Sequence, residues 1–385
     1  MGVLISNGNL LTVGGKLATA NAAPATPYMD AEYVAVADFN GNTSHYIKHA
    51  KLYNHTAIYI WEFVSQDQLQ NLDFSDASNN ITVIEASAFQ CARVNGFVLP
   101  NTISVLGEAC FASAFIATLV VPPLVTVLPV QTFSNIRPVY NHETKEVLPI
   151  NIILPQNLIT IEPYCFENAQ IKQLTIPDTV IEIGNGAFYF CKQLASITLP
   201  SGLQKISDYM FDYCINLASI TIPAAVTEIG AEAFAHAGLT SITIPSTVTI
   251  LGSGAFRGCE SLAHMDIQAN VTAIPDDFAP ECPLTSLTLP NTLQTIGESA
   301  FIKASGFQVT ELTIPASVTS IGTNAFGSNY ANQMTLTVLP TTPPTLGRNA
   351  FTLAAGSVIK VPAASVAAYK AANGWKDYAS YIVAM

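Results

Sequence analysis

One phenylalanine recurs at regular intervals along most of this chain, and this repeat limits the possible folds more than any other feature. Most intervals are 22 or 23 residues. A period of about 20 to 50 residues is typical of a solenoid, in which each repeat buries its apolar face only against its neighbours. We therefore expect a stack of repeats. The aligned residues are Phe89, Phe111, Phe133, Phe166, Phe188, Phe211, Phe234, Phe256, Phe278, Phe301, Phe326 and Phe351.

Each repeat has three parts, as in 194-LASITLPSGLQKISDYMFDYC-214. Apolar and polar residues alternate over residues 194–199, which predicts a strand with one buried face that ends at Pro200. A second short extended segment follows, and in several repeats a glycine then permits a sharp corner. In 255-AFRGCESL-262 the apolar spacings of three and four predict a helical turn that packs phenylalanine and cysteine inward.

The pattern I/L-P-x-x-V/L-x-x-I-G-x-x-A-F-x-x-C-x-x-L resembles the BspA-like leucine-rich repeat family over about residues 81 to 362. Val361-Pro362, Val366, Tyr369-Lys370 and Trp375 resemble the C-terminal cap of such proteins, an amphipathic helix that seals the last repeat. The resemblance implies a curved, right-handed α/β repeat solenoid with a parallel β-sheet. It also implies adhesion or host-factor binding at a bacterial, protozoan or occasionally viral surface.

The two ends of the chain depart from the repeat, so three regions are expected. Residues 1–75 contain a stretch, 28–63, that predicts short strands around the hairpin-favouring pair Asn40-Gly41. This region is interpreted as an N-terminal cap or small β domain, because a terminal repeat needs its apolar end covered. The alternative is an anchor to an oligomer or larger assembly. Residues 76–362 form about twelve repeats, and residues 363–385 form the C-terminal cap.

Two irregularities inside the array predict local changes. Between Phe133 and Phe166 the interval grows to 33 residues, and the excess around 137-RPVYNHETKEVLP-149 is expected to project as a loop. Around Phe278 the turn is shortened and carries Pro275, Asp276 and Asp277, so one corner of the stack is expected to be remodelled.

The charge composition disfavours two classes of binding partner. The 15 basic and 27 acidic residues give a formal charge of -12, which disfavours nucleic acid and anionic membrane surfaces. No apolar run is long enough for a membrane span. The first residues lack the charged and apolar regions of a secretory signal, so an exported protein would have lost its signal or left the cell by another route.

Residues capable of chemistry do not form a known catalytic or metal-binding pattern. The seven cysteines lack a C-x-x-C pair and mostly occupy apolar repeat positions, which favours buried structural thiols. His45, His49 and His55 are interpreted as cap or surface residues, and Asp276-Asp277 as a solvated corner. There is no P-loop and no G-x-S-x-G motif. We expect no enzyme activity, no cofactor and no metal.

The outward positions of the repeat strands are the candidate binding residues. Stacked parallel strands would align them in two columns about 4.8 Å per step. A simpler explanation is that threonine suits an exposed strand. The columns contain no Trp, Tyr or Arg, so modest affinity is expected, and the rung of His264 and Asp266 is the preferred local site. The candidates are Gln173, Thr175, Ser196, Thr198, Ser219, Thr221, Ser241, Thr243, His264, Asp266, Ser286 and Thr288.

Two functions remain in competition at this point. The first is a non-catalytic adhesin-like protein, extracellular or at a cell surface, that binds a host protein or glycan through the solenoid. The second is a structural or receptor-binding component of a virion, attached through residues 1–75. An enzyme acting on glycans would need clustered carboxylates, which the sequence does not contain.

Overall fold

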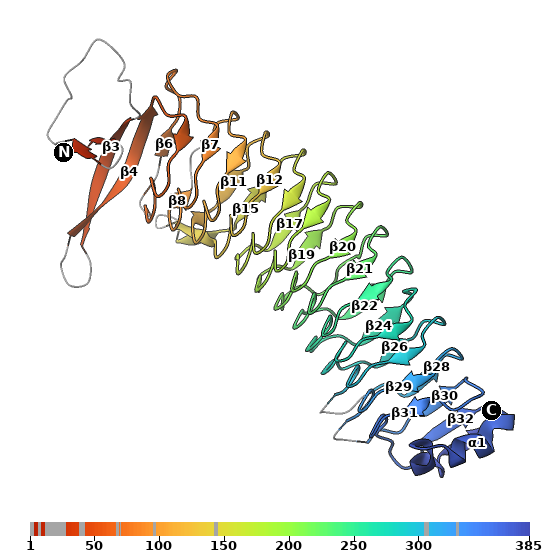
Figure 1. Ribbon diagram of the computed structural model, residues 1–385. Coiled ribbons are helices and arrows are strands. Elements are labelled where there is room, and N and C mark those ends of the chain that lie inside the picture. Colours follow the sequence, from red (N-terminus) through yellow and green to blue (C-terminus); the bar gives the residue numbers. More distant parts are fainter. Residues whose placement is uncertain are drawn as a thin grey trace. The chain divides into compact units, whose positions relative to one another are not determined.

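The protein divides into two compact units, residues 1–182 and 183–385, called unit 1 and unit 2 here. The computed structural model describes residues 4–6, 9–11, 28–37, 43–66, 69, 71–94, 98–141, 145–303, 308–328 and 331–385 (Figure 1). Both units are built from short parallel strands that join consecutive repeats in register, so the predicted repeat solenoid is confirmed.

Unit 1 begins with a five-stranded sheet that precedes the first repeats. Its order is β2-β1-β3-β4-β6, and its pairs are antiparallel except for the parallel pair β4 and β6. The predicted hairpin turn at Asn40-Gly41 lies outside the described residues. The strands are β1 (Leu4–Ser6), β2 (Asn9–Leu11), β3 (Tyr28–Ala37), β4 (Thr43–Tyr53) and β6 (Asn71–Asp73).

The repeats of unit 1 contribute strands to three sides of the stack. On one side lie β5 (Ala57–Ile58), β7 (Val83–Ile84), β9 (Val105–Leu106), β12 (Val127–Leu128) and β16 (Thr160–Ile161), with β18 (Glu182–Ile183) at the unit boundary. On the second lie β11 (Thr118–Val120), β15 (Asn151–Ile153) and β17 (Gln173–Thr175). On the third lie β8 (Arg93–Val94), β10 (Phe115–Ile116) and β13 (Arg137–Asn141). The side of β11, β15 and β17 is called the strand face of unit 1, and the side of unit 2 that carries the strands of the same repeat position is called the strand face of unit 2.

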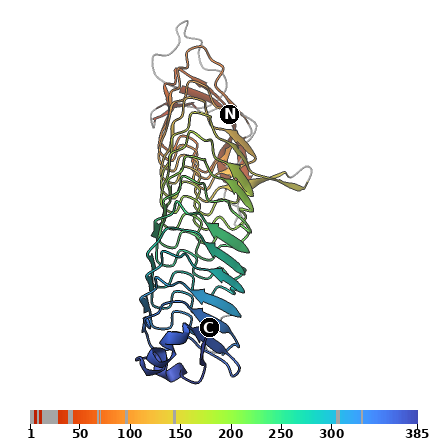
Figure 2. The same cartoon turned by 90° about the vertical axis from the view of Figure 1, so that its right-hand side faces the viewer.

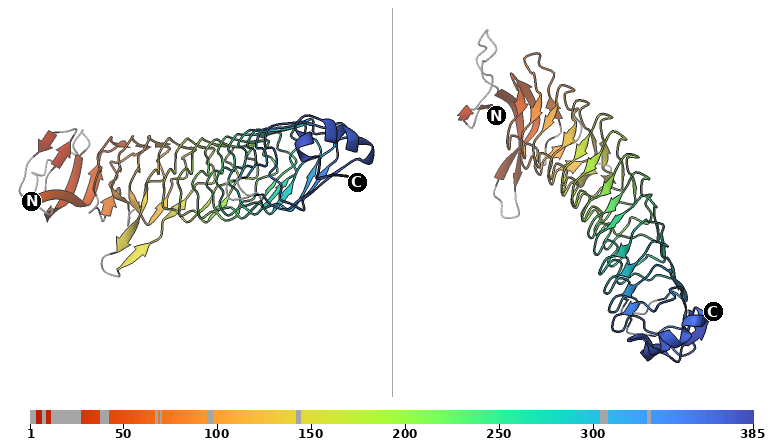
Figure 3. Two further views of the ribbon diagram at one scale, coloured as in Figure 1. Left: turned by 90° about the horizontal axis from the view of Figure 1, so that it is seen from below. Right: turned by 45° about the vertical axis from the view of Figure 1, so that its right-hand side comes forward.

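The insertion at 137–149 forms a hairpin rather than an irregular loop. Strand β13 continues outward and pairs antiparallel with β14 (Glu146–Leu148). The hairpin (yellow) projects from the body of unit 1, as expected for the insertion (Figures 2 and 3).

Unit 2 continues with the same strand pairs and ends in a small cap. Its strand face holds β19 (Ser196–Thr198), β22 (Ser241–Ile244), β24 (His264–Ile267), β26 (Ser286–Thr288), β28 (Glu311–Ile314), β30 (Thr335–Val338) and β32 (Val358–Val361). Its other strands are β20 (Lys205–Ile206), β21 (Glu228–Ile229), β23 (Ile250–Leu251), β25 (Ala273–Ile274), β27 (Thr295–Ile296), β29 (Ser320–Ile321) and β31 (Thr345–Leu346). The cap holds η1 (Ala363–Ser365), α1 (Val366–Ala371), η2 (Trp375–Tyr378) and β33 (Ile382–Ala384).

The recurring phenylalanines form the centre of the core in each unit. In unit 1 the rings of Phe63, Phe89, Phe111, Phe133 and Phe166 stack with centroids 5.2–5.6 Å apart. In unit 2 the column runs from Phe188 to Phe351 with separations of 5.3–6.0 Å. Phe278 stands edge-on to both neighbours, at 75° and 82°, at the corner predicted to be remodelled. Phe63 adds a ring that the sequence alignment missed.

The segment around each phenylalanine is not a helix, so the predicted helical turn is wrong. At Phe211 the amides of Phe211 and Tyr213 donate to carbonyls of the next repeat, whereas those of Asp212 and Cys214 donate three residues back. Tyr209 and Tyr213 both have a φ near +57° to +59°. A helix would direct every amide back along its own chain, so the alternating pattern instead ties neighbouring repeats together.

The cysteines are part of this core. All seven are free thiols, and every one except the half-buried Cys91 is buried. The Sγ atoms of Cys214, Cys259 and Cys282 each donate to a phenylalanine carbonyl of an earlier repeat at 3.0–3.3 Å. Burial raises the pKa of the Cys110 thiol. The prediction of structural thiols is confirmed for these residues.

The C-terminal cap covers the last repeat of unit 2 with two aromatic side chains. Tyr369 and Trp375 are fully buried. The Tyr369 hydroxyl donates to the Pro340 carbonyl at 2.8 Å, and Trp375 Nε1 donates to the Pro344 carbonyl at 2.7 Å. In the described part of the chain, no helix is long and apolar enough to cross a membrane.

Candidate functional site

The predicted polar columns are best formed in the middle of unit 2. Strands β22, β24 and β26 pair in parallel so that Ser241, His264 and Ser286 align. Thr243, Asp266 and Thr288 align in the same way. The residues between them, such as Ile242 and Met265, are buried. The alternation of apolar and polar residues therefore places these polar side chains on the outer surface of the strand face.

The remaining predicted residues are exposed, but they do not all lie in strands of one sheet. Gln173 and Thr175 lie exposed in β17 of unit 1, and Ser196 and Thr198 lie exposed in β19 of unit 2. Ser219 and Thr221 are also exposed, but their segment is not part of a strand. Asp266 is only half-exposed, and its Oδ2 accepts a hydrogen bond from Gln268 Nε2 at 2.7 Å.

Unit 1 carries a different surface on its strand face. The outward position two residues before the repeat proline is threonine in most repeats of unit 2. In unit 1 it is Val98, Val120 and Ile153 in three successive repeats, and Thr175 in the next. These side chains are 77%, 48% and 45% exposed. Val120 and Ile153 are paired directly across β11 and β15. We call Val98, Val120 and Ile153 the apolar strip.

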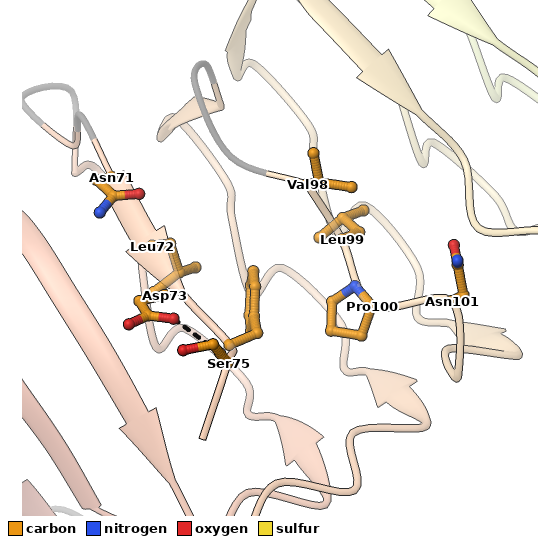
Figure 4. Close-up of a pocket in the computed structure, with 9 residues that line it drawn as sticks. Asn71, Leu72, Asp73, Ser75, Val98, Leu99, Pro100 and Asn101 are labelled. Atoms are coloured by element: carbon orange, nitrogen blue, oxygen red, sulfur yellow. Dashed lines mark hydrogen bonds between the residues drawn. The ribbon is translucent and has the colours of Figure 1, made fainter. Parts of the chain in front are cut away.

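A pocket lies at the end of the apolar strip that contains Val98. It has a volume of about 620 Å³ and lies between β6 and the extended segment 98–101 (Figure 4). Val98 and Pro100 belong to one wall, and Leu72 and Asp73 belong to the other. We call it the strand-face pocket. Its lining is Asn71, Leu72, Asp73, Phe74, Ser75, Val98, Leu99, Pro100 and Asn101.

The carboxylate of Asp73 in the strand-face pocket interacts with Ser75 and Lys51. Asp73 Oδ1 accepts a hydrogen bond from the Ser75 amide at 2.7 Å, and Asp73 Oδ2 lies 3.7 Å from Lys51 Nζ. The hydrogen bonds from Ser75, and secondly the Lys51 ammonium, lower the pKa of Asp73. The carboxylate is therefore ionised at neutral pH, and both of its oxygens already have partners inside the protein.

The hairpin of unit 1 adds a second exposed apolar feature. Tyr140 and Val147 form a directly opposed pair across β13 and β14, and both are exposed. Val139, whose side chain points to the opposite face, is buried. The hairpin therefore packs one face on the protein and presents an aromatic and a valine side chain on the other.

Two of the three histidines named in the sequence analysis, His49 and His55, lie close to a glutamate side chain. His55 is buried, with Nε2 2.9 Å from Glu62 Oε1 and Nδ1 2.9 Å from the Tyr53 carbonyl. His49 Nε2 lies 3.9 Å from Glu32, and the side chain of His45 lies outside the described residues. Among the described residues, no three His, Cys, Asp or Glu side chains form a group suited to a metal ion.

The adjacent carboxylates Asp276 and Asp277 serve the corner where they lie. Asp276 Oδ1 accepts a hydrogen bond from the Glu298 amide at 2.7 Å, and Asp277 pairs with Arg257 at 3.3 Å. They point to different partners. This is the arrangement expected of a structural turn, and it does not place two carboxylates across a shared cleft.

A short column of stacked rings lies outside the core of unit 2. The rings of Tyr213 and His236 stack with centroids 4.2 Å apart, and the Phe190 ring, tilted by 35°, has its centroid 4.4 Å from that of Tyr213. His236 Nδ1 lies 3.1 Å from Oδ1 of the buried Asp212. Burial raises the pKa of Asp212, and the hydrogen bond with His236 opposes that shift. These ring contacts and the hydrogen bond between Asp212 and His236 join neighbouring turns, so we assign them a structural role.

Sequence reasoning found the polar columns but missed the apolar strip and the pocket. The strip had a visible signal, because the position of Thr175 can be followed backwards to Ile153, Val120 and Val98. The pocket had none, since it depends on how far two extended segments separate.

Comparison with known proteins identifies the repeat. A model of the BspA type leucine rich repeat region matches six copies over residues 33–139, 148–238 and 227–356. A comparison with curated proteins found no match.

Solved structures with a similar fold include three bacterial proteins. A leucine-rich repeat protein from Bacteroides ovatus has 18% identity and a TM-score of 0.47, covering 92% of this chain and 98% of its own. A leucine rich cell surface protein from Faecalibacterium prausnitzii has 20% identity and a TM-score of 0.43, covering 80% and 93%. The pneumococcal vaccine antigen PcpA has 15% identity and a TM-score of 0.44, covering 91% and 80%.

Proposed function

The chain belongs to the BspA-type leucine-rich repeat family, and from this premise we propose that it is a non-catalytic protein that binds a host protein or glycan at a cell surface. The strand face is the proposed binding surface. In unit 1 the candidate contact residues are those of the apolar strip, and in unit 2 they are the polar columns that include Ser241, Thr243 and His264. The virion alternative gains no support from the comparisons.

The observation that carries this proposal is the exposure of the apolar strip. Val98 is 77% exposed, although its side chain would be more stable out of water. Single exposed apolar residues are common on proteins, but here three occupy the same position of successive repeats. A run of apolar side chains on a face that is elsewhere lined with threonine supports a contact surface for a partner.

The polar columns of unit 2 support broad, weak binding of a partner by that unit. Their hydroxyls are repeated at the spacing of the strands, so a long partner can meet many of them at once. Each contact is expected to be modest, because aromatic and arginine side chains supply most hot spots at interfaces. Measurable affinity for the columns of unit 2 would then need several such contacts to form at once.

Binding can be tested with the purified full chain on an array of extracellular matrix proteins and mammalian oligosaccharides. We expect a signal that falls at least tenfold in Val120→Lys and Ile153→Lys, because lysine places a charge in the apolar contact. The matched control is Val105→Lys, which changes a 50%-exposed valine on the other side of the repeats.

Different results of these experiments would contradict different parts of the proposal. Loss of binding in Val105→Lys to the same degree would contradict a role for the strand face. Absence of any array signal would contradict the proposed ligand classes. Protease treatment of intact source cells tests the location, because a surface protein is degraded while the cells remain whole.

A further inference from the structure

Two asparagine–glycine pairs lie in the described part of unit 2. Asn185-Gly186 precedes the core residue Phe188, and Asn373-Gly374 joins α1 to η2 in the C-terminal cap. Asparagine is one of the chemically labile residues. When glycine follows it, the glycine amide nitrogen can attack the Cγ atom of the asparagine side chain, because glycine has no side chain that hinders the approach. Both pairs are therefore candidates for self-modification.

The two pairs are alike in exposure and in glycine conformation. Asn185 and Asn373 are both exposed, so water reaches both side chains. Gly186 has a φ of +60° and Gly374 has a φ of +81°, so both glycines are in the left-handed region. Neither exposure nor glycine conformation distinguishes the reactivity of the two pairs.

The pairs differ in the hydrogen bond of the glycine amide. The Gly186 amide donates to the Asp208 carbonyl at 2.8 Å, one of the bonds that join neighbouring repeats. Within the described part of the chain, the Gly374 amide has no protein acceptor. Gly374 is the N-cap of η2, and the first amides of a helix lack acceptors inside it. The attack requires the amide to lose its proton and its nitrogen to move towards Cγ, and the bond to Asp208 opposes both steps only at Gly186.

The packing of the cap requires glycine at position 374. A Cβ atom there would lie 3.0 Å from both the Cβ and the carbonyl oxygen of Leu346. The left-handed φ adds a conformational cost for any other residue. The residue that makes Asn373 reactive is therefore one that the cap needs for its own fold.

We propose that Asn373 is a site of spontaneous deamidation by water. The bond between the Gly374 nitrogen and Asn373 Cγ forms while the bond between Cγ and Nδ2 breaks, and ammonia leaves with the former amide proton. This closes a five-membered succinimide ring. Water then opens the ring at either carbonyl, which gives aspartate or isoaspartate. The net reaction consumes a water molecule and releases ammonia, and no oxidant or reductant takes part.

This site lies between the two aromatic residues that hold the cap in place. The Tyr369 hydroxyl donates to the Pro340 carbonyl on one side of it, and Trp375 Nε1 donates to the Pro344 carbonyl on the other. Isoaspartate inserts a methylene carbon into the backbone between these two contacts, and either product adds a negative charge. Deamidation of Asn373 therefore loosens the cap as the protein ages.

Peptide mapping of the aged full chain tests the site. Trypsin releases residues 371–376 and 173–192, and each peptide contains a single asparagine. The folded protein is held at pH 8.5, and chromatography with mass spectrometry measures aspartate and isoaspartate at intervals. We expect the peptide 371–376 to be converted at least tenfold faster than 173–192. In urea the bond to Asp208 is lost, and the two rates should agree within about threefold.

Asn373→Gln and its matched control Asn185→Gln test the effect on the cap. Glutamine would have to close a larger ring, so Asn373→Gln should prevent the modification, and circular dichroism verifies that both variants fold. Hydrogen exchange in β32 and β33 should become faster on ageing in wild type and in Asn185→Gln but not in Asn373→Gln. Conversion of 371–376 no faster than 173–192 in the folded protein would overturn the site. Unchanged exchange in β32 and β33 after conversion would overturn the loosening of the cap.

Discussion

At the scale of single residues, the repeat depends on two left-handed positions that flank each core phenylalanine. Tyr209 and Tyr213 occupy them around Phe211, and Gly254 and Gly258 occupy them around Phe256. Most residues pay a conformational cost there, which glycine avoids. The turn is kept because its amides bond to the next repeat, as Phe211 and Tyr213 do. The residue types at these positions can therefore vary while the geometry stays the same.

Gly258→Ala tests a left-handed position at which a side chain would also collide with a neighbouring repeat. Its φ is +64°, and a Cβ atom would lie 2.7 Å from Cδ2 of His236. We expect a loss of about 1–3 kcal/mol in the free energy of unfolding, measured by denaturant titration. Gly202→Ala is the matched control, because its Cβ would meet nothing within 4 Å. A loss of equal size in Gly202→Ala would show that the contact with His236 is not responsible.

At the scale of elements, the sequence was a good guide to strands and a poor one to turns. Alternation and a closing proline located strands such as β19 and β22. Apolar spacings of three and four suggested a helix around each phenylalanine, but a turn with bonds three residues back produces the same spacing. Phe63 was missed because 26 residues separate it from Phe89 and no cysteine follows it. The pocket beside β6 could not be predicted, since no residue pattern reports the separation of two strands.

Asp212 gives the turn around Phe211 a pH dependence that can be measured. Burial raises the pKa of this carboxyl in the folded protein above its ordinary value of 3.8. The folded state therefore binds the proton more tightly than the unfolded state, and this contribution to stability is complete below pH 3.8. It is lost as the pH rises through the higher folded pKa.

Asp212→Asn removes the titrating group and keeps an oxygen that can accept a hydrogen bond from His236. The stability difference, variant minus wild type, should therefore rise as the pH is increased from 3 through the raised pKa and then level off. Parallel urea titrations of both proteins between pH 3 and 7 measure it. A difference that stays constant or falls over this range would contradict the assigned burial cost.

At the scale of the whole molecule, stability is expected to be the sum of neighbouring contacts rather than the property of one core. Each stacked pair of phenylalanines, such as Phe211 and Phe234, joins only adjacent repeats. The last repeat has no successor, and the cap residues Tyr369 and Trp375 cover it instead. Damage at an end should therefore remain near that end.

Trp375→Ala makes this prediction quantitative. Removing a fully buried tryptophan should cost about 3–5 kcal/mol, and the loss should appear first in the nearest strands. Hydrogen exchange should show faster exchange in β30 and β32 while β7 and β9 in unit 1 stay protected. The control is Trp61→Ala, whose side chain is 68% exposed. Uniform loss of protection across both units would mean that the protein unfolds as one cooperative body.

The burial of six thiols affects how the protein reacts with oxidants and disulfides. A thiol must ionise to react with oxidants or exchange with disulfides, and burial opposes that ionisation in Cys110, Cys165, Cys214 and Cys259. The cysteines are free thiols in the folded protein, so glutathione has no cross-link to reduce among these residues. The array should keep the same melting temperature under reducing and oxidising conditions, which leaves its stability independent of the redox potential on either side of a cell envelope.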